Sequence, residues 1–192
     1  MSLQEKGAFV SEGPVIVLRS IFLRGTSLWT VDDSIAIVNA TINSSENSTL
    51  MVCMIDCQGC DITGSGTLIT KCPEKSRNSF VVKLTLNWAG RILSPQNPSY
   101  FQQCVITLAD TLGANFIGQF VIQSGLVSAT DSIALAGIVV LEKSVVLFRS
   151  GNGNWKINGT LVLAENCDLK GNVLTFQALS DNSSLELRQT VV

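Results

Sequence analysis

The stretch VVKLTLNWAGRIL, residues 81–93, carries the clearest folding signal in the chain. Apolar residues alternate with polar ones at Val82, Leu84 and Leu86, the pattern breaks at residues 87–90, and it resumes at Ile92. A period of two residues is typical of a β-strand, and a glycine at the break is typical of a tight turn. The stretch therefore predicts a β-hairpin, and it contains no pattern for catalysis.

Similar short apolar stretches, bounded by Gly, Asn, Asp and Ser, recur along the whole chain. No stretch of helical length places apolar residues at the spacing of a helix face, and the many β-branched residues favour strands. Short strands separated by turns at about eight to twelve residues predict an all-β protein. The pattern is compatible with a sandwich, a barrel or a β-solenoid.

Composition limits the function classes. The 192 residues fit one domain. Hydrophobic residues make up 46%, and the mean hydropathy is +0.35, which suggests apolar surface buried between subunits. Thirteen basic and fifteen acidic residues give a net charge of −2 without a basic run, which argues against nucleic-acid binding. The apolar runs are too short to span a bilayer, so we expect no membrane insertion.

The chain has no histidine. This removes the commonest general base and metal ligand, so a hydrolase triad or a zinc-bound water would need an unusual substitute. We therefore expect a protein that is not an enzyme and that has no cofactor.

The cysteines and the glycosylation sequons give conflicting signals about the compartment. Five Asn-x-Ser/Thr sequons begin at Asn39, Asn43, Asn47, Asn158 and Asn182, as in exported proteins. The first residues, MSLQEKGAFVSEGP, lack the apolar core of a signal peptide. Giving more weight to the second observation, we predict that the cysteines stay reduced. They are Cys53, Cys57, Cys60, Cys72, Cys104 and Cys167.

Two groups of residues invite a catalytic or metal-binding interpretation. Cys53, Cys57 and Cys60 have the spacing of an iron–sulfur motif, but they fall on an expected core strand and its turn, so buried or turn cysteines are favoured. Asp32 and Asp33 could be paired carboxylates or calcium ligands, and adjacent aspartates also favour a solvated turn. We therefore expect no catalytic residue and no metal site.

Two further patterns have a plain structural interpretation. Gly151-Asn-Gly-Asn154 resembles a phosphate-binding nest, but no helix or Lys-Ser/Thr follows, so it predicts a hairpin loop. Trp29, Trp88 and Trp155 could form a platform for a sugar, although packing in a core or interface is the commoner use of tryptophan.

Several pieces, in order, resemble the head domain of adenovirus fibre proteins. The segment TSLWT at residues 26–30 resembles the Leu-Trp-Thr start of such heads. The segments at residues 48–59, 80–94, 115–125 and 134–143 are similar to later head strands. The likeness covers about half of the chain. The loop region between residues 100 and 115 is shorter than in the family, and the end, LTFQALSDNSSLELRQTVV, does not match its usual finish.

This resemblance implies an antiparallel β-sandwich that forms a homotrimer at the tip of a viral fibre. Residues 1–25 would be a tail and the end of the shaft, and residues 26–192 would be the head. The protein would bind a host-cell receptor, either a protein or a sialylated glycan, through exposed loops. It would be made in the host cytosol and carried on the virion surface.

The polar loops supply the candidate receptor-binding residues, which are Asp32, Asp33, Glu46, Glu74, Lys75 and Arg77. The structural alternative is a right-handed β-helix, suggested by the even strand spacing, although no fixed repeat period is visible. Its functional counterparts are a structural or adhesive β-solenoid protein and a β-helix carbohydrate enzyme. Such an enzyme would depend on Asp32, Asp33 or Glu46.

Overall fold

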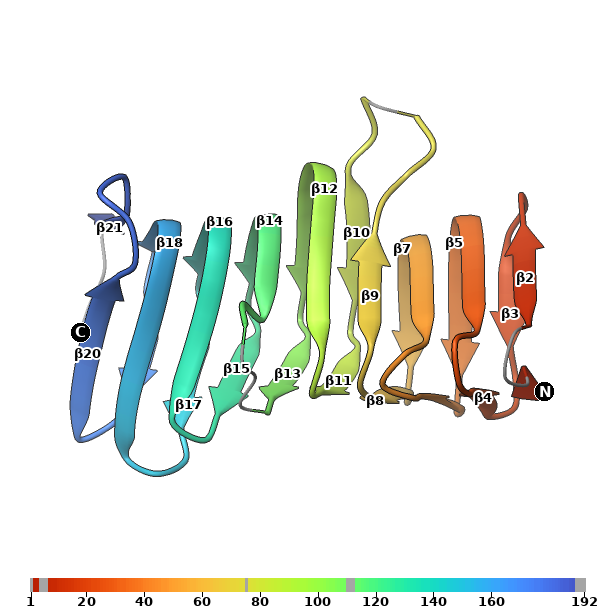
Figure 1. Ribbon diagram of the computed structural model, residues 1–192, viewed down its shortest axis with the longest axis horizontal. Helices are drawn as coiled ribbons and strands as arrows, with labels where there is room; N and C mark the ends of the chain where they lie inside the picture. The colour runs from red at the N-terminus through yellow and green to blue at the C-terminus, as the bar shows by residue number, and fades with distance from the viewer. Residues whose placement is uncertain (1, 4–6, 75, 110–112, 189–192) are drawn as a thin grey trace.

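The computed structural model describes residues 2–3, 7–74, 76–109 and 113–188. Every regular element assigned in these residues is a β-strand, so the all-β prediction is confirmed. The predicted antiparallel sandwich is wrong, because the paired strands run parallel and stack along one axis as a β-solenoid of about 8 turns (Figure 1). The β-solenoid part of the structural alternative is therefore correct.

The described strands form two sheets. The short-strand sheet has the order β1 (Ser2–Leu3), β4 (Ile21–Leu23), β6 (Thr41–Ser44), β8 (Asp61–Gly64), β11 (Thr85–Trp88), β13 (Val105–Leu108), β15 (Leu126–Ala129), β17 (Val145–Phe148) and β19 (Asp168–Lys170). The long-strand sheet has the order β2 (Ala8–Ser11), β5 (Leu28–Val38), β7 (Thr49–Gln58), β10 (Ser79–Val82), β12 (Arg91–Gln102), β14 (Phe116–Gln123), β16 (Ser132–Glu142), β18 (Asn152–Ala164) and β20 (Val173–Ala178). Beside these lie β3 (Val15–Val17), β9 (Thr67–Thr70) and β21 (Ser184–Arg188), which pair with long strands.

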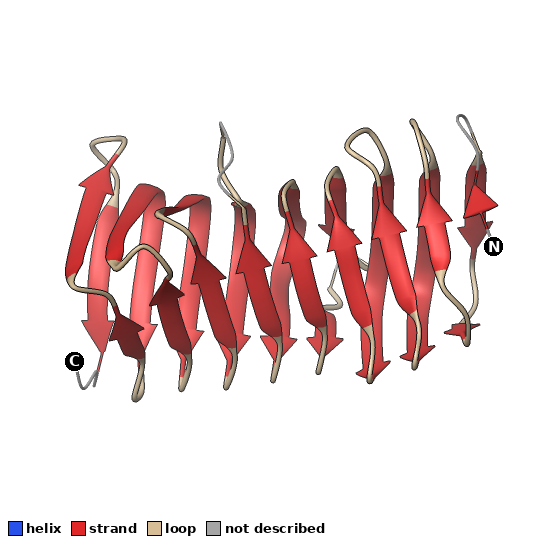
Figure 2. Ribbon diagram, turned by 90° about the horizontal axis from the view of Figure 1, so that it is seen from below, coloured by secondary structure: helices blue, strands red, loops and turns tan. Residues whose placement is uncertain are grey.

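Each turn of the solenoid has three sides. In most turns a long strand runs up one side, bends over an arch and comes down a second side, and a short strand closes the third side (Figure 1). In one turn the separate strands β9 and β10 take the place of the long strand. Figure 2 shows strands of neighbouring turns lying side by side along the axis. At the arch, Gly118, Gly137 and Gly159 are in register and have positive φ angles, which side chains disfavour.

The core consists of columns of inward side chains, one residue from each turn. Ile55, Val81, Phe101 and Ile122 are consecutive members of one such column, and each is at most 1% exposed. In a parallel ladder the side chains of successive strands stack directly, so alternation along each strand gives continuous apolar columns. Trp29, Trp88 and Trp155 are also buried, so the core interpretation of the tryptophans is confirmed.

The hairpin predicted for residues 81–93 is wrong, and only part of its placement is correct. The strand expected through Val82, Leu84 and Leu86 is divided by a corner at residues 83–84, and residues 87–88 of the expected turn belong to β11. The strands β10, β11 and β12 lie on successive sides of the solenoid, and β11 pairs with β8 and β13 of the neighbouring turns. Gly90 forms a corner, where a Cβ would lie 1.9 Å from the carbonyl oxygen of Gly66. The hairpin loop predicted at Gly151 is likewise a corner, between β17 and β18.

The repeat period varies because the corners and insertions differ in length. Stacked residues are separated by 19 positions between Val127 and Val146 and by 24 between Ile62 and Leu86. The longer turn contains the connection between β9 and β10, whose described residues, 71–74 and 76–78, rise above the arch (Figure 1). We call this segment the ridge loop.

Residues of the predicted tail and shaft are part of the same stack. The strands β2 and β3 pair with β5, and β4 pairs with β6. The described residues contain no helix long and apolar enough to cross a membrane.

Candidate functional site

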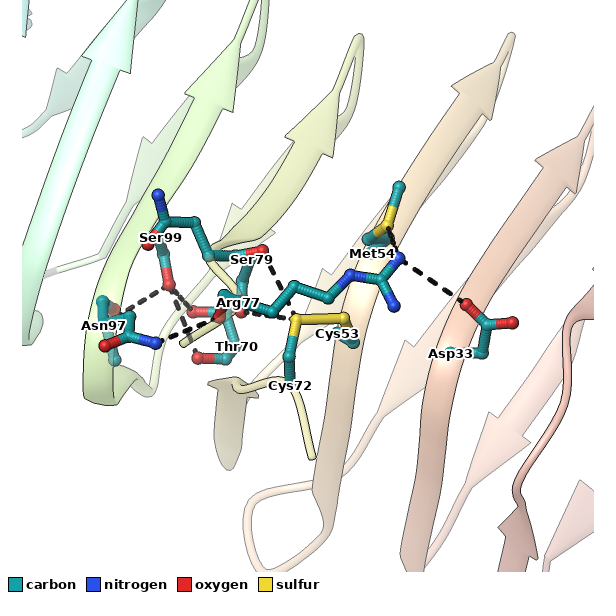
Figure 3. Close-up of a disulfide and its surroundings, with 11 residues drawn as sticks. Asp33, Cys53, Met54, Thr70, Cys72, Arg77, Ser79, Asn97 and Ser99 are labelled. Atoms are coloured by element: carbon teal, nitrogen blue, oxygen red, sulfur yellow. Dashed lines mark hydrogen bonds and ion pairs between the residues drawn. A yellow bond between two sulfur atoms is a disulfide. The ribbon is translucent and has the colours of Figure 1, made fainter. Parts of the chain in front are cut away.

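The ridge loop is fixed to the solenoid by a disulfide. Cys72, at the start of the loop, is bonded to Cys53 of β7 (Figure 3). A second disulfide joins Cys57 and Cys60, whereas Cys104 and Cys167 are free and buried. The expectation of buried or turn cysteines is confirmed, but the prediction of reduced thiols is wrong for the four bonded residues.

Arg77 ties the other end of the ridge loop to three strands. Its guanidinium lies 3.9 Å from the Asp33 carboxylate and donates to the Met54 sulfur at 3.0 Å. Its backbone carbonyl accepts a hydrogen bond of 3.1 Å from the Asn97 amide of β12 (Figure 3). The loop is therefore held across β5, β7 and β12.

A group of hydroxyls supports the arch below the ridge loop. Ser99 is hydrogen-bonded to Thr70 and to Ser94, each at 2.7 Å, and Ser94 donates to the Asn97 carbonyl at 2.7 Å. These bonds lie where the pairing of β12 shifts register between Ser94 and Ser99. The irregular segment is thus stabilised by buried hydrogen bonds.

The descending halves of the long strands carry a column of apolar side chains that point away from the core. Its members are half-buried and in register, and they are Met54, Phe80, Tyr100, Val121 and Val140. The rings of Phe80 and Tyr100 stack with centroids 5.2 Å apart and an interplanar angle of 17°. Because Met54 also contacts Arg77, the column begins at the ridge loop.

A ladder of amides and a carboxylate runs beside this column. The Gln102 amide donates to the Gln123 carbonyl oxygen at 3.0 Å, and the Gln123 amide donates to the Glu142 carboxylate at 2.7 Å. The three residues line a groove of about 410 Å³ together with Val82, Gln103, Ser124 and Lys143. We call the apolar column and this ladder together the ladder face.

The corner below the ladder face has a left-handed backbone. Gln103, Ser124 and Lys143 have φ angles of 54°, 52° and 50°. The backbone N–H groups of Gln103 and Ser124 each donate to a carbonyl of the next turn at 2.9 Å, which holds this disfavoured conformation. Lys143 forms an exposed ion pair of 3.1 Å with Glu165.

Cys104 lies inside this corner. Burial raises the pKa of its thiol to about 11, although hydrogen bonds with nearby backbone groups lower it in part. Its Sγ lies 3.4 Å from the carbonyl oxygens of Val81 and Gln102. Since the thiolate is disfavoured, this cysteine is a core residue and a poor nucleophile.

The structure brings together some of the predicted binding residues and separates others. Asp33 and Arg77 are in contact, and Asp32 is next to Asp33 in β5. Glu74 belongs to the ridge loop, as Arg77 does. The solvated turn expected at Asp32 and Asp33 is wrong, because both lie within β5, where its pairing shifts register.

Glu46 and Lys75 are not in this group. Glu46 lines a different groove, of about 300 Å³, at the corner near Gly66 and Arg91. Lys75 lies outside the described residues. Within the part of the chain that the structure describes, no cluster of three His, Cys, Asp or Glu residues could hold a metal ion.

The ladder face was missed by the sequence analysis, although a signal for it exists. Tyr100-Phe-Gln102, Val121-Ile-Gln123 and Val140-Leu-Glu142 each place an apolar residue two positions before a Gln or Glu. The residue that follows each segment is left-handed. The pattern becomes visible only when the turns are aligned by their corners.

Comparisons with known protein families, curated proteins and solved structures find no match to this chain. Nothing in them identifies an adenovirus fibre head.

Proposed function

We propose that this protein is a structural or adhesive β-solenoid that binds its partner through the ladder face and the adjoining ridge loop. The observation that carries the proposal is the fixed position of this loop. A disulfide, an ion pair and a backbone hydrogen bond hold it beside a half-exposed apolar column. A rigid loop loses little conformational entropy on binding, which favours recognition.

The carboxylates support adhesion over catalysis. Asp33 faces Arg77, and Glu142 accepts a hydrogen bond from Gln123. Glu46 lies at another corner. A glycosidase needs two carboxylates on either side of one bond, about 5 to 10 Å apart, whereas Glu46 lines a groove that does not include Asp32 or Asp33, and Asp33 is paired with Arg77. Attachment to a host-cell receptor and trimer formation stay predictions.

An adhesion assay tests the proposal. Beads coated with the protein are presented to cultured animal cells and to immobilised plant, bacterial and animal polysaccharides. We expect retention on at least one surface, and a reduction of about tenfold by Val121→Arg on the ladder face. The matched variant Val105→Arg makes the same change at an exposed position of the short-strand sheet and should bind normally.

The outcomes separate the alternatives. Equal loss in both variants, or no retention on any surface, would contradict the adhesive function. Release of new reducing ends or unsaturated sugars from the same polysaccharides would instead establish a carbohydrate enzyme.

A further inference from the structure

We infer that the ladder face binds a neutral oligosaccharide, which lies along the solenoid axis over the Phe80–Tyr100 pair and the Gln102–Gln123–Glu142 ladder. This inference rests on the proposed adhesive function and assigns its ligand class. It is carried by the juxtaposition of an apolar column and a hydrogen-bonding column on one face, above a groove of about 410 Å³.

The apolar column matches one side of a sugar ring. A pyranose has a face of C–H groups that packs on apolar surface, here the outward edges of the stacked rings and the valine methyls, whereas its hydroxyls lie at the ring edge. Phe80 and Tyr100 are stacked in register on neighbouring strands, and Val121 and Val140 continue the column. Aromatic side chains combine a large contact area with few rotatable bonds, so they bind at a low entropic cost.

The ladder matches the hydroxyls. Tyr100 and Gln102 are two positions apart on one strand and so point to the same side. The described hydrogen bonds use one N–H of Gln102, one N–H and the oxygen of Gln123, and one oxygen of Glu142. An amide has two donors and two acceptor lone pairs, so each glutamine keeps capacity for a ligand.

The repeat of the solenoid sets the direction of the ligand. Neighbouring parallel strands lie about 4.8 Å apart, so each column places one side chain at this interval along the axis. Val82, Gln102, Gln123 and Glu142 lie on four successive strands and line the same groove. An extended chain of rings would therefore meet the same pair of columns on each turn.

The charges favour a neutral ligand over an acidic one. Lys143, the cation among the residues that line the groove, faces Glu165 at 3.1 Å, and Arg77 of the ridge loop faces Asp33 at 3.9 Å. Lys83 lies at the same corner but does not line the groove. The Glu142 carboxylate itself lines the groove. A sialylated or sulfated glycan in the groove would meet this carboxylate, and the cation that lines the groove, Lys143, is already paired with Glu165.

A glycan array followed by calorimetric titration tests the inference. The probes are short oligosaccharides of glucose, xylose, mannose and galactose, with sialylated and sulfated glycans beside them. We expect at least one neutral series to bind, and Tyr100→Ala to weaken its binding about tenfold. Tyr100→Phe keeps the ring and should bind within about twofold of the original protein.

Gln123→Leu probes the ladder separately from the aromatic pair. We expect it to weaken the same titration about fivefold, whereas Thr107→Val on the short-strand sheet should leave it unchanged. Unfolding curves of all variants show whether a loss of binding reflects a loss of fold.

Three results would overturn the inference: no binding of any neutral series, binding of acidic glycans alone, or full binding by Tyr100→Ala. The adhesive function is judged separately. Adhesion that is abolished by protease treatment of the target surface and survives its oxidation by periodate would retain that function and reject the sugar ligand.

Discussion

Two outer faces of the solenoid share one backbone plan but carry different side chains. On the short-strand sheet, a central column of small polar residues is hydrogen-bonded within itself: Thr63 donates to Asn43 at 2.8 Å, and Thr107 pairs with Ser128 at 3.2 Å. The ladder face instead presents stacked rings beside longer amides. The parallel stacking of the strands thus fixes the positions of the side chains, and the residue types decide whether a face is suited to binding.

The faces also differ in their boundaries. The ladder face ends above at the arch, where glycines stack closely, and carries the disulfide-bonded ridge loop. Across the central column of the short-strand sheet lies the side chain of Arg149, which donates to Thr107 and Ser128 at 3.3 Å each. We therefore expect substitutions around the ladder face to have the larger effects.

Gly137→Ala should have the largest effect. The new Cβ would lie 2.2 Å from the Gly118 carbonyl oxygen, at a φ of 131°, so the arch would have to move. We expect the free energy of unfolding to fall by about 3 to 5 kcal/mol in urea titration. Gly13→Ala is the control, because its Cβ would meet no atom within 4 Å. Equal stability of the two variants would refute the close stacking.

Removal of the Cys53–Cys72 disulfide should come next. The bond joins residues 19 positions apart, and the double change to serine should cost about 3 kcal/mol by raising the entropy of the unfolded chain. The same change at Cys57 and Cys60, only 3 positions apart, should cost about half as much. Thermal unfolding of both variants checks this order, and a reversed order would contradict it.

Alkaline pH should weaken the corner between the two faces. Burial raises the pKa of Cys104 from 9.0 to about 11, so between these values the folded protein retains a proton that the unfolded chain releases. Stability from this group is fully present below pH 9 and is lost as the pH rises to about 11. The expected loss is about 2 kcal/mol. Cys104→Ala should show a correspondingly flatter dependence in urea titrations across this range.

Much of the fold could be predicted from local patterns. Alternation at Val82, Leu84 and Leu86 indicated extended chain but not the corner that divides it into β10 and β11, and Gly90 marked a change of direction. The partner strands could not be predicted, because a corner of a solenoid and a turn of a hairpin require similar residues. Parallel stacking depends on contacts about 20 residues apart, and the ridge loop lengthens one turn and hides the period.

The candidate site was only partly predictable for the same reason. Charged residues of the ridge loop stood out as a polar cluster, and Arg77 does contact Asp33. Phe80, Tyr100 and Gln123 look like ordinary strand residues when the sequence is followed in order. They form a candidate binding surface only because the strand register places residues of different turns side by side.

The smallest expected losses of stability come from one substitution on each face, so they compare the two faces directly. Gln123→Leu removes the middle of the ladder, which accepts from Gln102 and donates to Glu142, so we expect a loss of about 1 kcal/mol in urea titration. Thr107→Val removes the bond to Ser128 and an acceptor of Arg149 on the other face, where about 0.5 kcal/mol is expected. Because Arg149 also donates to Ser128, that face retains a partner for its guanidinium, whereas the ladder is cut in two. A larger loss for Thr107→Val would mean that the short-strand face, not the ladder face, has the more tightly coupled hydrogen bonds.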